Sequence, residues 1–236
     1  MNDVNEVNDE DEADALQACL AAGRYVDSGH PAVVAFARDT APEGDARAIA
    51  VALYYAVRDG IRYDPYRIDL APEGLTASRC LANGYGFCVT KAALLAAALR
   101  VHGIAARLGF ADVRNHLTSE RLRRTMGTDL FTFHGYTEIW LDGRWVKATP
   151  AFNLSLCERA GTHALEFDGR SDSILQPFDV SGRRHMEYVR ERGSFADVPR
   201  EEIIRVWDET YPPTVEWKRD AGQADFESEV RRAGDR

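Results

Sequence analysis

The chain has 236 residues, of which 45% are hydrophobic and 28% charged, and these values exclude a fully disordered or collagen-like protein. Its formal net charge of -9 is uneven, because residues 1–14 contain seven acidic side chains and no basic one. The rest of the chain is almost neutral and lacks the basic stripe of a nucleic-acid binder. We expect an acidic disordered arm at 1–14, one domain at 15–217 and a charged tail at 218–236.

The sequence also indicates a compartment. No stretch approaches the roughly 18 consecutive apolar residues of a membrane helix, and the N-terminus lacks the basic and apolar regions of a secretory signal. The four cysteines, Cys19, Cys80, Cys88 and Cys157, form no CxxC pair and no cluster with zinc-ligand spacing. We therefore expect reduced thiols in a cytoplasmic protein with no membrane partner, no metal and no cofactor. The sequence leaves the oligomeric state open.

Helices dominate the predicted N-terminal half. Asp45 is suited to cap the helix that follows it, and Gly60 stands at the end of that helix. Apolar residues on nearly every side of 89–102 predict a buried central helix, which Gly103 ends. The segment 61–87 is rich in turn residues and is expected to be irregular. In chain order, the predicted helices are 13–26, 32–38, 46–58 and 89–102.

Strands follow the central helix. The predicted strands are 105–113, 131–141 and 144–149, with a long polar loop at 114–130. Asp142-Gly143 is a two-residue hairpin signal, so the strands on either side of it should pair. The C-terminal third is expected to hold a strand within 161–168, a mixed segment at 182–193 and a helix at 199–210. Helices followed by an antiparallel sheet indicate an α+β fold.

Cys88 is the first candidate catalytic residue. It stands where the buried helix begins, so the helix dipole and unpaired backbone N–H groups would stabilise its thiolate and bind an oxyanion. Gly84 and Gly86 would let an extended substrate approach the backbone. Tyr85 and Phe87 either line the acyl site or pack against the sheet. The alternative interpretation is that Cys88 is only a small buried residue.

A nucleophilic cysteine needs a base, and His134 is the candidate. It lies in a predicted strand among aromatic residues, where an ionisable side chain costs free energy unless it has a partner. A structural histidine is the default interpretation of one histidine on a strand. The presence of Cys88 in the same chain makes the functional interpretation the better one.

Five short motifs in a fixed order carry a family resemblance. They are Gly86-Phe87-Cys88, Lys91-Ala92-Ala93-Leu94-Leu95, His102-Gly103-Ile104-Ala105-Ala106-Arg107, His134-Gly135-Tyr136-Thr137-Glu138-Ile139-Trp140 and Asp142-Gly143-Arg144-Trp145-Val146. Together the motifs resemble those of the transglutaminase-like superfamily, whose fold is related to that of papain-type proteases. The resemblance covers about residues 46–155 and implies a buried helix carrying the cysteine, packed on an antiparallel sheet carrying the histidine. Residues 156–217 would then be a C-terminal extension.

The sequence departs from the family pattern at one position. The family usually has an aspartate after the hairpin, and here Thr149 takes its place. A threonine hydroxyl can accept a hydrogen bond from the histidine but supplies no negative charge. Asn153 could orient the ring as an amide, although its spacing does not match, and Glu138 shares strand parity with His134. A solvated strand glutamate or a partner for Arg144 is an equally good interpretation of Glu138.

The resemblance implies an enzyme that attacks an amide or peptide carbonyl through a thioester of Cys88, with His134 moving the proton. Hydrolysis is favoured over transamidation, by analogy only. The expected substrate is a peptide or protein amide. The alternative is a decayed module that keeps the fold and binds a peptide or protein partner in the old cleft, which the change at Thr149 would permit.

Overall fold

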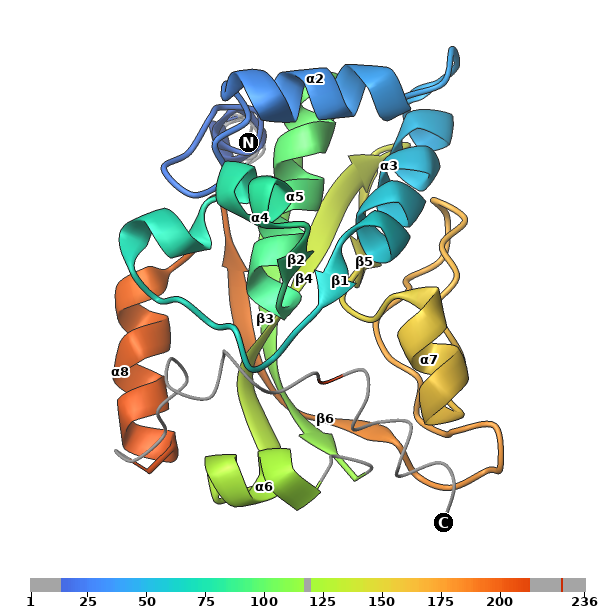
Figure 1. The fold of residues 1–236 in the computed structure, drawn as a ribbon. Helices are drawn as coiled ribbons and strands as arrows, with labels where there is room; N and C mark the ends of the chain where they lie inside the picture. Colours follow the sequence, from blue (N-terminus) through green and yellow to red (C-terminus); the bar gives the residue numbers. More distant parts are fainter. Residues whose placement is uncertain (1–13, 117–119, 213–225, 227–236) are drawn as a thin grey trace, which may run out of the picture.

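The computed structural model describes residues 14–116, 120–212 and 226. Nearly all of the predicted acidic arm and all of the predicted charged tail except Phe226 therefore lie outside the described residues. Within the described part, helices pack on an antiparallel sheet, so the predicted α+β class is confirmed (Figure 1). No helix in this part is long and apolar enough to cross a membrane.

The first helix is shorter than predicted. It covers residues 14–18 and does not continue to Val26. The carboxylate of Asp197 accepts hydrogen bonds from the N–H groups of Arg24 (2.7 Å) and Val26 (2.9 Å), which a helix would otherwise use. A contact with a distant residue thus overrides the local helical pattern.

The segment expected to be irregular, 61–87, contains a helix. Helix α4 follows a 3₁₀ turn, begins after Thr76, whose hydroxyl accepts the N–H of Arg79 (3.2 Å), and ends at Gly84 in the left-handed conformation (φ 66°). Gly84, one of the turn residues of this segment, is a helix C-cap. The helical elements of the N-terminal half are α2 (Pro31–Thr40), α3 (Ala46–Gly60), η1 (Pro72–Leu75), α4 (Ala77–Asn83) and α5 (Cys88–Val101).

Helix α5 is the centre of the molecule, as its composition predicts. Thirteen of its residues, from Cys88 to Arg100, are buried. Figure 1 shows α5 in front of the sheet, with α2 across its C-terminal end and α3 and α4 on its two sides. The N-terminal end of α5 points toward the middle of the molecule, where the parallel pair β1 (Arg62–Tyr63) and β2 (Tyr85–Gly86) lies.

The sheet has four antiparallel strands in the order β5-β4-β3-β6. The three predicted strands are confirmed, and the predicted mixed segment contains the fourth. The strands are β3 (Ala106–Asn115), β4 (Leu130–Leu141), β5 (Arg144–Ala148) and β6 (Met186–Phe195). The prediction of a loop at 114–130 was wrong in part, because this segment contains α6 (Glu120–Met126) and the ends of β3 and β4.

Each face of the sheet is covered. On one face Thr137 of β4 donates a hydrogen bond to the carbonyl of Ala92 in α5 (3.0 Å), and the large core lies between them. On the other face a smaller apolar cluster contains Tyr136 and Met186. Packing on both faces explains why nine of the twelve residues of β4 are buried.

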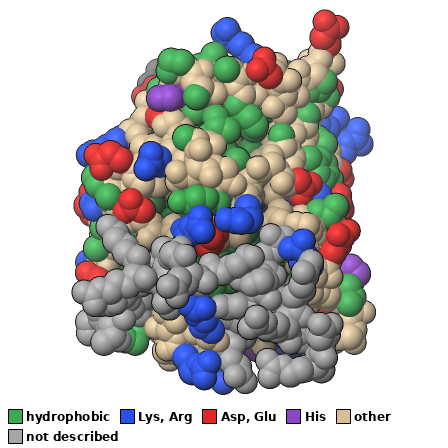
Figure 2. Space-filling view, viewed as in Figure 1, with side chains coloured by type: hydrophobic (Ala, Val, Ile, Leu, Met, Phe, Trp, Pro, Cys, Tyr) green, Lys and Arg blue, Asp and Glu red, His purple; other side chains and the backbone are tan. Residues whose placement is uncertain are grey.

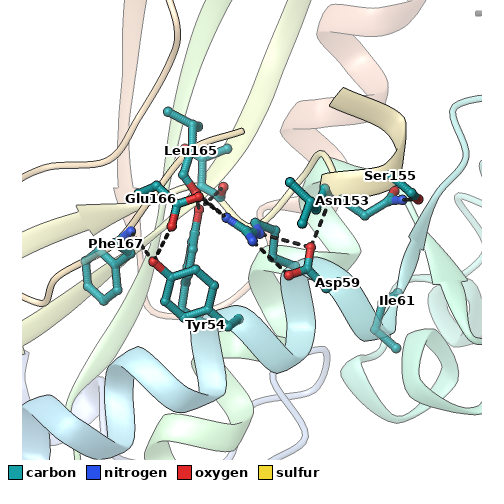
Figure 3. Close-up of polar contacts among 12 residues, drawn as sticks. Tyr54, Asp59, Ile61, Asn153, Ser155, Leu165, Glu166 and Phe167 are labelled. Carbon is teal, nitrogen blue, oxygen red and sulfur yellow. Dashed lines mark hydrogen bonds and ion pairs between the residues drawn. The ribbon is translucent and has the colours of Figure 1, made fainter. Parts of the chain in front are cut away.

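The C-terminal third differs from prediction at one element. Residues 161–168 form no strand, and a helix, α7 (Leu154–Ala160), precedes them. The carbonyl of Leu165 accepts hydrogen bonds from Tyr54 (2.8 Å) and Arg58 (2.8 Å) of α3, so side chains take the place of a neighbouring strand. Figure 3 shows the same contact region, where the N–H of Leu154 donates to Asp59 (2.9 Å).

Helix α8 (Arg200–Thr210) is confirmed and packs against β4. The indole Nε1 of Trp207 donates to the carbonyl of Thr132 (3.1 Å), and the hydroxyl of Tyr211 accepts the N–H of Thr132 (2.8 Å). The C-terminal extension is therefore attached to the strand that carries His134. On the face seen in Figure 2, basic, acidic and hydrophobic side chains are mixed.

Candidate active site

Cys88 is the first residue of α5. Phe87 before it is extended (φ -108°, ψ -178°), and its N–H donates to the hydroxyl of Thr90 (3.1 Å), which fixes the start of the helix. The backbone N–H groups of Gly135, Val89 and Cys88 face the Cys88 sulfur and act to lower the pKa of its thiol. The thiol thus lies beside backbone N–H groups at the positive end of the helix, as the sequence predicts.

His134 reaches the same place from β4. A Cβ atom on the next residue, Gly135, would lie 3.1 Å from the Cα of Val89, so the strand touches the first turn of α5. A side chain at this position would force the neighbouring backbone to shift by a few tenths of an ångström. Because Gly135 follows His134 and Val89 follows Cys88, the contact brings the two candidate residues to one place.

Cys88 and His134 line one cavity of about 30 Å³. That volume has room for one or two water molecules and not for a peptide. Both residues are buried, with 8% of Cys88 and 5% of His134 exposed. No hydrogen bond joins the thiol to the imidazole among the described residues. We call this site closed, because its cavity is too small to admit a peptide.

Burial dominates the protonation of both groups. It raises the pKa of the Cys88 thiol to about 11, although the surrounding N–H groups act to lower it. It also lowers the pKa of His134 to about 4. The expected stabilisation of the thiolate by the helix is present, but in the closed site the loss of solvation outweighs it. Thiol and imidazole are thus both neutral near pH 7.

The three candidates for the third residue are bonded elsewhere. The hydroxyl of Thr149 donates to the carbonyl of Ile174 (3.0 Å). The carboxylate of Glu138 accepts a hydrogen bond from Nε of Arg107 (2.5 Å), so Glu138 pairs with an arginine, although the expected partner, Arg144, was wrong. Neither Thr149 nor Glu138 has a hydrogen bond to the His134 ring among the described residues.

Asn153 acts on a different neighbour. Its side-chain oxygen accepts the N–H of Tyr63 (3.1 Å), and its NH₂ group donates to the hydroxyl of Ser155 (2.8 Å; Figure 3). Tyr63 lines the cavity of Cys88. Asn153 thus holds the backbone of a cavity residue and is not an amide partner of the His134 ring in this structure.

The residues before Cys88 divide into two groups. Phe87 lines the cavity, whereas Tyr85 lies outside it and stacks under the guanidinium of Arg67 (4.9 Å). A Cβ atom on Gly86 would lie 2.5 Å from the hydroxyl of Thr90, so this glycine is needed for packing in the interior. Gly86 therefore has a structural role, and its expected role in the approach of a substrate stays a prediction.

Sequence reasoning missed a carboxylate that shapes the histidine strand. Asp112 of β3 is buried, accepts the N–H of Phe133 (3.2 Å) and pairs with Arg192 through two hydrogen bonds (2.9 and 2.7 Å). Phe133 has a positive φ of 54°, and the register of β3 and β4 shifts at this point. Asp112 therefore holds the irregular backbone next to His134. Nothing local in the sequence indicates this pairing.

Aromatic residues from distant segments complete the cavity, and these were also missed. Tyr63 comes from β1, Phe131 from β4, and Trp207 and Tyr211 from the region of α8. The amphipathic pattern of α8 predicts that its apolar face is buried. It does not reveal that this face covers Cys88.

Comparison with known proteins gives one family. Residues 34–150, about half of the chain, match the model of the transglutaminase-like superfamily. Two solved structures are similar in part: a putative cysteine protease from Cytophaga hutchinsonii (14% identity, TM-score 0.48, covering 78% of this chain) and a putative protease from Parabacteroides distasonis (19% identity, TM-score 0.36, covering 52%). The chain spans 47% of the first protein and 23% of the second. No curated protein matches the sequence.

Proposed function

The chain belongs to the transglutaminase-like superfamily, and from that premise we propose that it is a cysteine-dependent hydrolase of amide or peptide bonds. The observation that carries the proposal is the shared cavity. Cys88 begins a buried helix among backbone N–H groups, and His134 lines the same cavity from the strand that touches this helix. A nucleophile, a base and oxyanion donors are the components that acyl transfer requires.

The proposed reaction has two halves. His134 takes the thiol proton while the sulfur attacks the substrate carbonyl, and the N–H groups at the start of α5 stabilise the oxyanion. The tetrahedral intermediate collapses to a thioester, and the amine leaves with the proton from His134. Water then attacks the thioester with His134 again as base, the acid leaves, and Cys88 regains its proton.

The closed cavity indicates how a bound substrate has to change the surroundings of Cys88 and His134. In the buried site the neutral pair is favoured, because burial raises the pKa of Cys88 and lowers that of His134. Entry of a polar amide and water would reduce both shifts and favour proton transfer. We therefore infer that substrate displaces cavity side chains such as Trp207 and Tyr211 before the chemical step.

The site is proposed to work as a dyad. Asp112 would position the strand of His134 through the backbone, and no acid bonded directly to the imidazole is part of the proposal. A cationic His134 would then be less stabilised than in a full triad. The lack of an acid bonded to the His134 ring among the described residues also favours a second candidate function, a module that binds a peptide or protein without turnover.

One experiment decides between the enzyme and the binding module. Purified protein is mixed with N-acetyl-alanine 4-nitrophenyl ester, quenched in acid, and its intact mass is measured. We expect an added acetyl-alanyl group on Cys88, released 4-nitrophenol and turnover. Cys88→Ser should abolish the added group and the turnover. Cys157→Ser, which changes another buried free thiol, should retain them.

His134→Gln should lower turnover about 100-fold or more, because it removes the base. Equal activity of the Cys88 and Cys157 variants, or no acyl-enzyme in any protein, would refute the enzyme proposal. Adding methylamine separates the two acyl-transfer outcomes, since hydrolysis gives the free acid and transamidation gives the methylamide. The free acid is the product that we expect. The cytoplasmic location stays a prediction.

A further inference from the structure

Phe226 is a C-terminal residue that packs beside the candidate site. Its ring lies edge-to-face with Tyr63 (5.9 Å between centroids) and with Tyr66 (5.7 Å). It also lines a second cavity together with His134 and Phe131. A residue from the far end of the chain thus fills space next to the proposed base.

The two cavities adjoin each other. Tyr63, Leu122, Phe131 and His134 line both of them, with Cys88 in one and Phe226 in the other. Because His134 lines both cavities, a peptide whose scissile carbonyl lies at Cys88 can place a neighbouring side chain in the second cavity. The position of Phe226 marks where such a side chain would lie.

The lining of both cavities selects for an uncharged aromatic group. No Asp, Glu, Lys or Arg is present among the described residues that line them. A charged side chain would lose its hydration there without a partner. Aromatic rings favour the edge-to-face contacts that Tyr63 and Tyr66 already make with Phe226.

We propose that the second cavity, together with the space that the Phe226 ring fills beside it, is the subsite for an aromatic side chain of the substrate, and that Phe226 acts there as an intramolecular competitor. This inference rests on the proposed function, which it extends to a class of substrate. Because Phe226 belongs to the same chain, it competes at a high effective concentration, and an external ligand must displace it.

The test is binding of N-acetyl-phenylalaninamide to the full chain, followed by the NMR signals of the His134 ring. Phe226→Ala should bind this probe about fivefold or more tightly than the unchanged protein, because the subsite is freed. Phe178→Ala is the matched control, since Phe178 is 52% exposed and lines neither cavity. Phe226→Trp should retain an aromatic occupant and bind the probe no more tightly than the unchanged protein.

Binding and turnover separate the two proposals. The subsite proposal is overturned if Phe226→Ala and the unchanged protein bind N-acetyl-phenylalaninamide equally well, or if neither binds it. It is also overturned if Phe226→Ala binds the α-amide of N-acetyl-aspartic acid, whose side chain is charged, as tightly as it binds N-acetyl-phenylalaninamide. Tighter binding with a shifted His134 signal supports the subsite even if no variant turns over an ester, and in that case the hydrolase proposal fails alone. If the protein turns over the acetyl-alanyl ester but Phe226→Ala binds the probe no more tightly than the unchanged protein, the hydrolase proposal stands and the subsite proposal fails.

Discussion

Lys91 provides the sharpest test of how the helix of Cys88 is held. Its side chain is completely buried, and its ammonium group donates to the carbonyls of Arg58 (2.9 Å) and Ile61 (2.5 Å) at the end of α3. Burial lowers the pKa of Lys91 from 10.5 to about 7. The group thus connects the cysteine helix to α3 through carbonyls that a helix end leaves unpaired.

The shift predicts how stability depends on pH. Below pH 7 the amine of Lys91 is charged in both the folded and the unfolded chain, so folding has to bury the charge. Between pH 7 and 10.5 the unfolded chain binds the extra proton, and the free energy of unfolding therefore rises with pH. A lowering of the pKa from 10.5 to about 7 corresponds to about 5 kcal/mol over that range.

Lys91→Met removes the charge and keeps much of the volume, but it leaves two carbonyls unpaired, at about 1–3 kcal/mol each. We expect the variant to be less stable than the unchanged protein near pH 10. Near pH 6 it should be equally stable or more stable, because the unchanged protein there carries the penalty of the buried charge.

Urea unfolding at pH 6, 8 and 10 measures this difference. Lys147→Met is the control, because Lys147 is partly exposed, pairs with Glu191 and has a raised pKa, so its effect should stay constant over this range. A stability difference for Lys91→Met that varies by less than about 1 kcal/mol from pH 6 to pH 10 would refute the reasoning.

Three further predictions concern the site. Thr149→Val should cost about 1 kcal/mol of stability by removing the bond to a carbonyl and leave turnover nearly unchanged; a large loss of turnover would restore Thr149 as the orienting residue. Asp112→Asn should cost about 3 kcal/mol in urea unfolding and lower turnover, and unchanged kinetics would contradict the positioning role. Gly135→Ala should cost about 1–3 kcal/mol and lower turnover, because its Cβ would lie 3.1 Å from backbone, whereas Gly29→Ala, with open space around it, should do neither.

Local patterns were sufficient for the elements that carry the chemistry. The apolar residues around α5 predict a buried helix because no side of it can face water, and the Asp142-Gly143 turn predicts the β4–β5 hairpin. The candidates Cys88 and His134 follow from the same patterns together with the family motifs. These features depend on neighbouring residues in the chain, which is why the sequence alone could indicate them.

Other features depend on residues far apart in the chain. The helix expected to reach Val26 ends early because Asp197 takes its N–H groups, and the strand expected near Leu165 is absent because α3 takes its carbonyl. Such bonds compete with local structure, and no local pattern shows that the partner will be present.

The state of the site was also decided by the tertiary structure. The sequence by itself determined a cysteine at the start of a buried helix and a histidine on a strand, with the dipole favouring thiolate. Only the fold brought Trp207 and Phe131 over the thiol, and their cover makes burial the dominant effect on the pKa of Cys88. Solvation depends on everything that packs around a group, whereas the helix dipole depends only on the residues next to it.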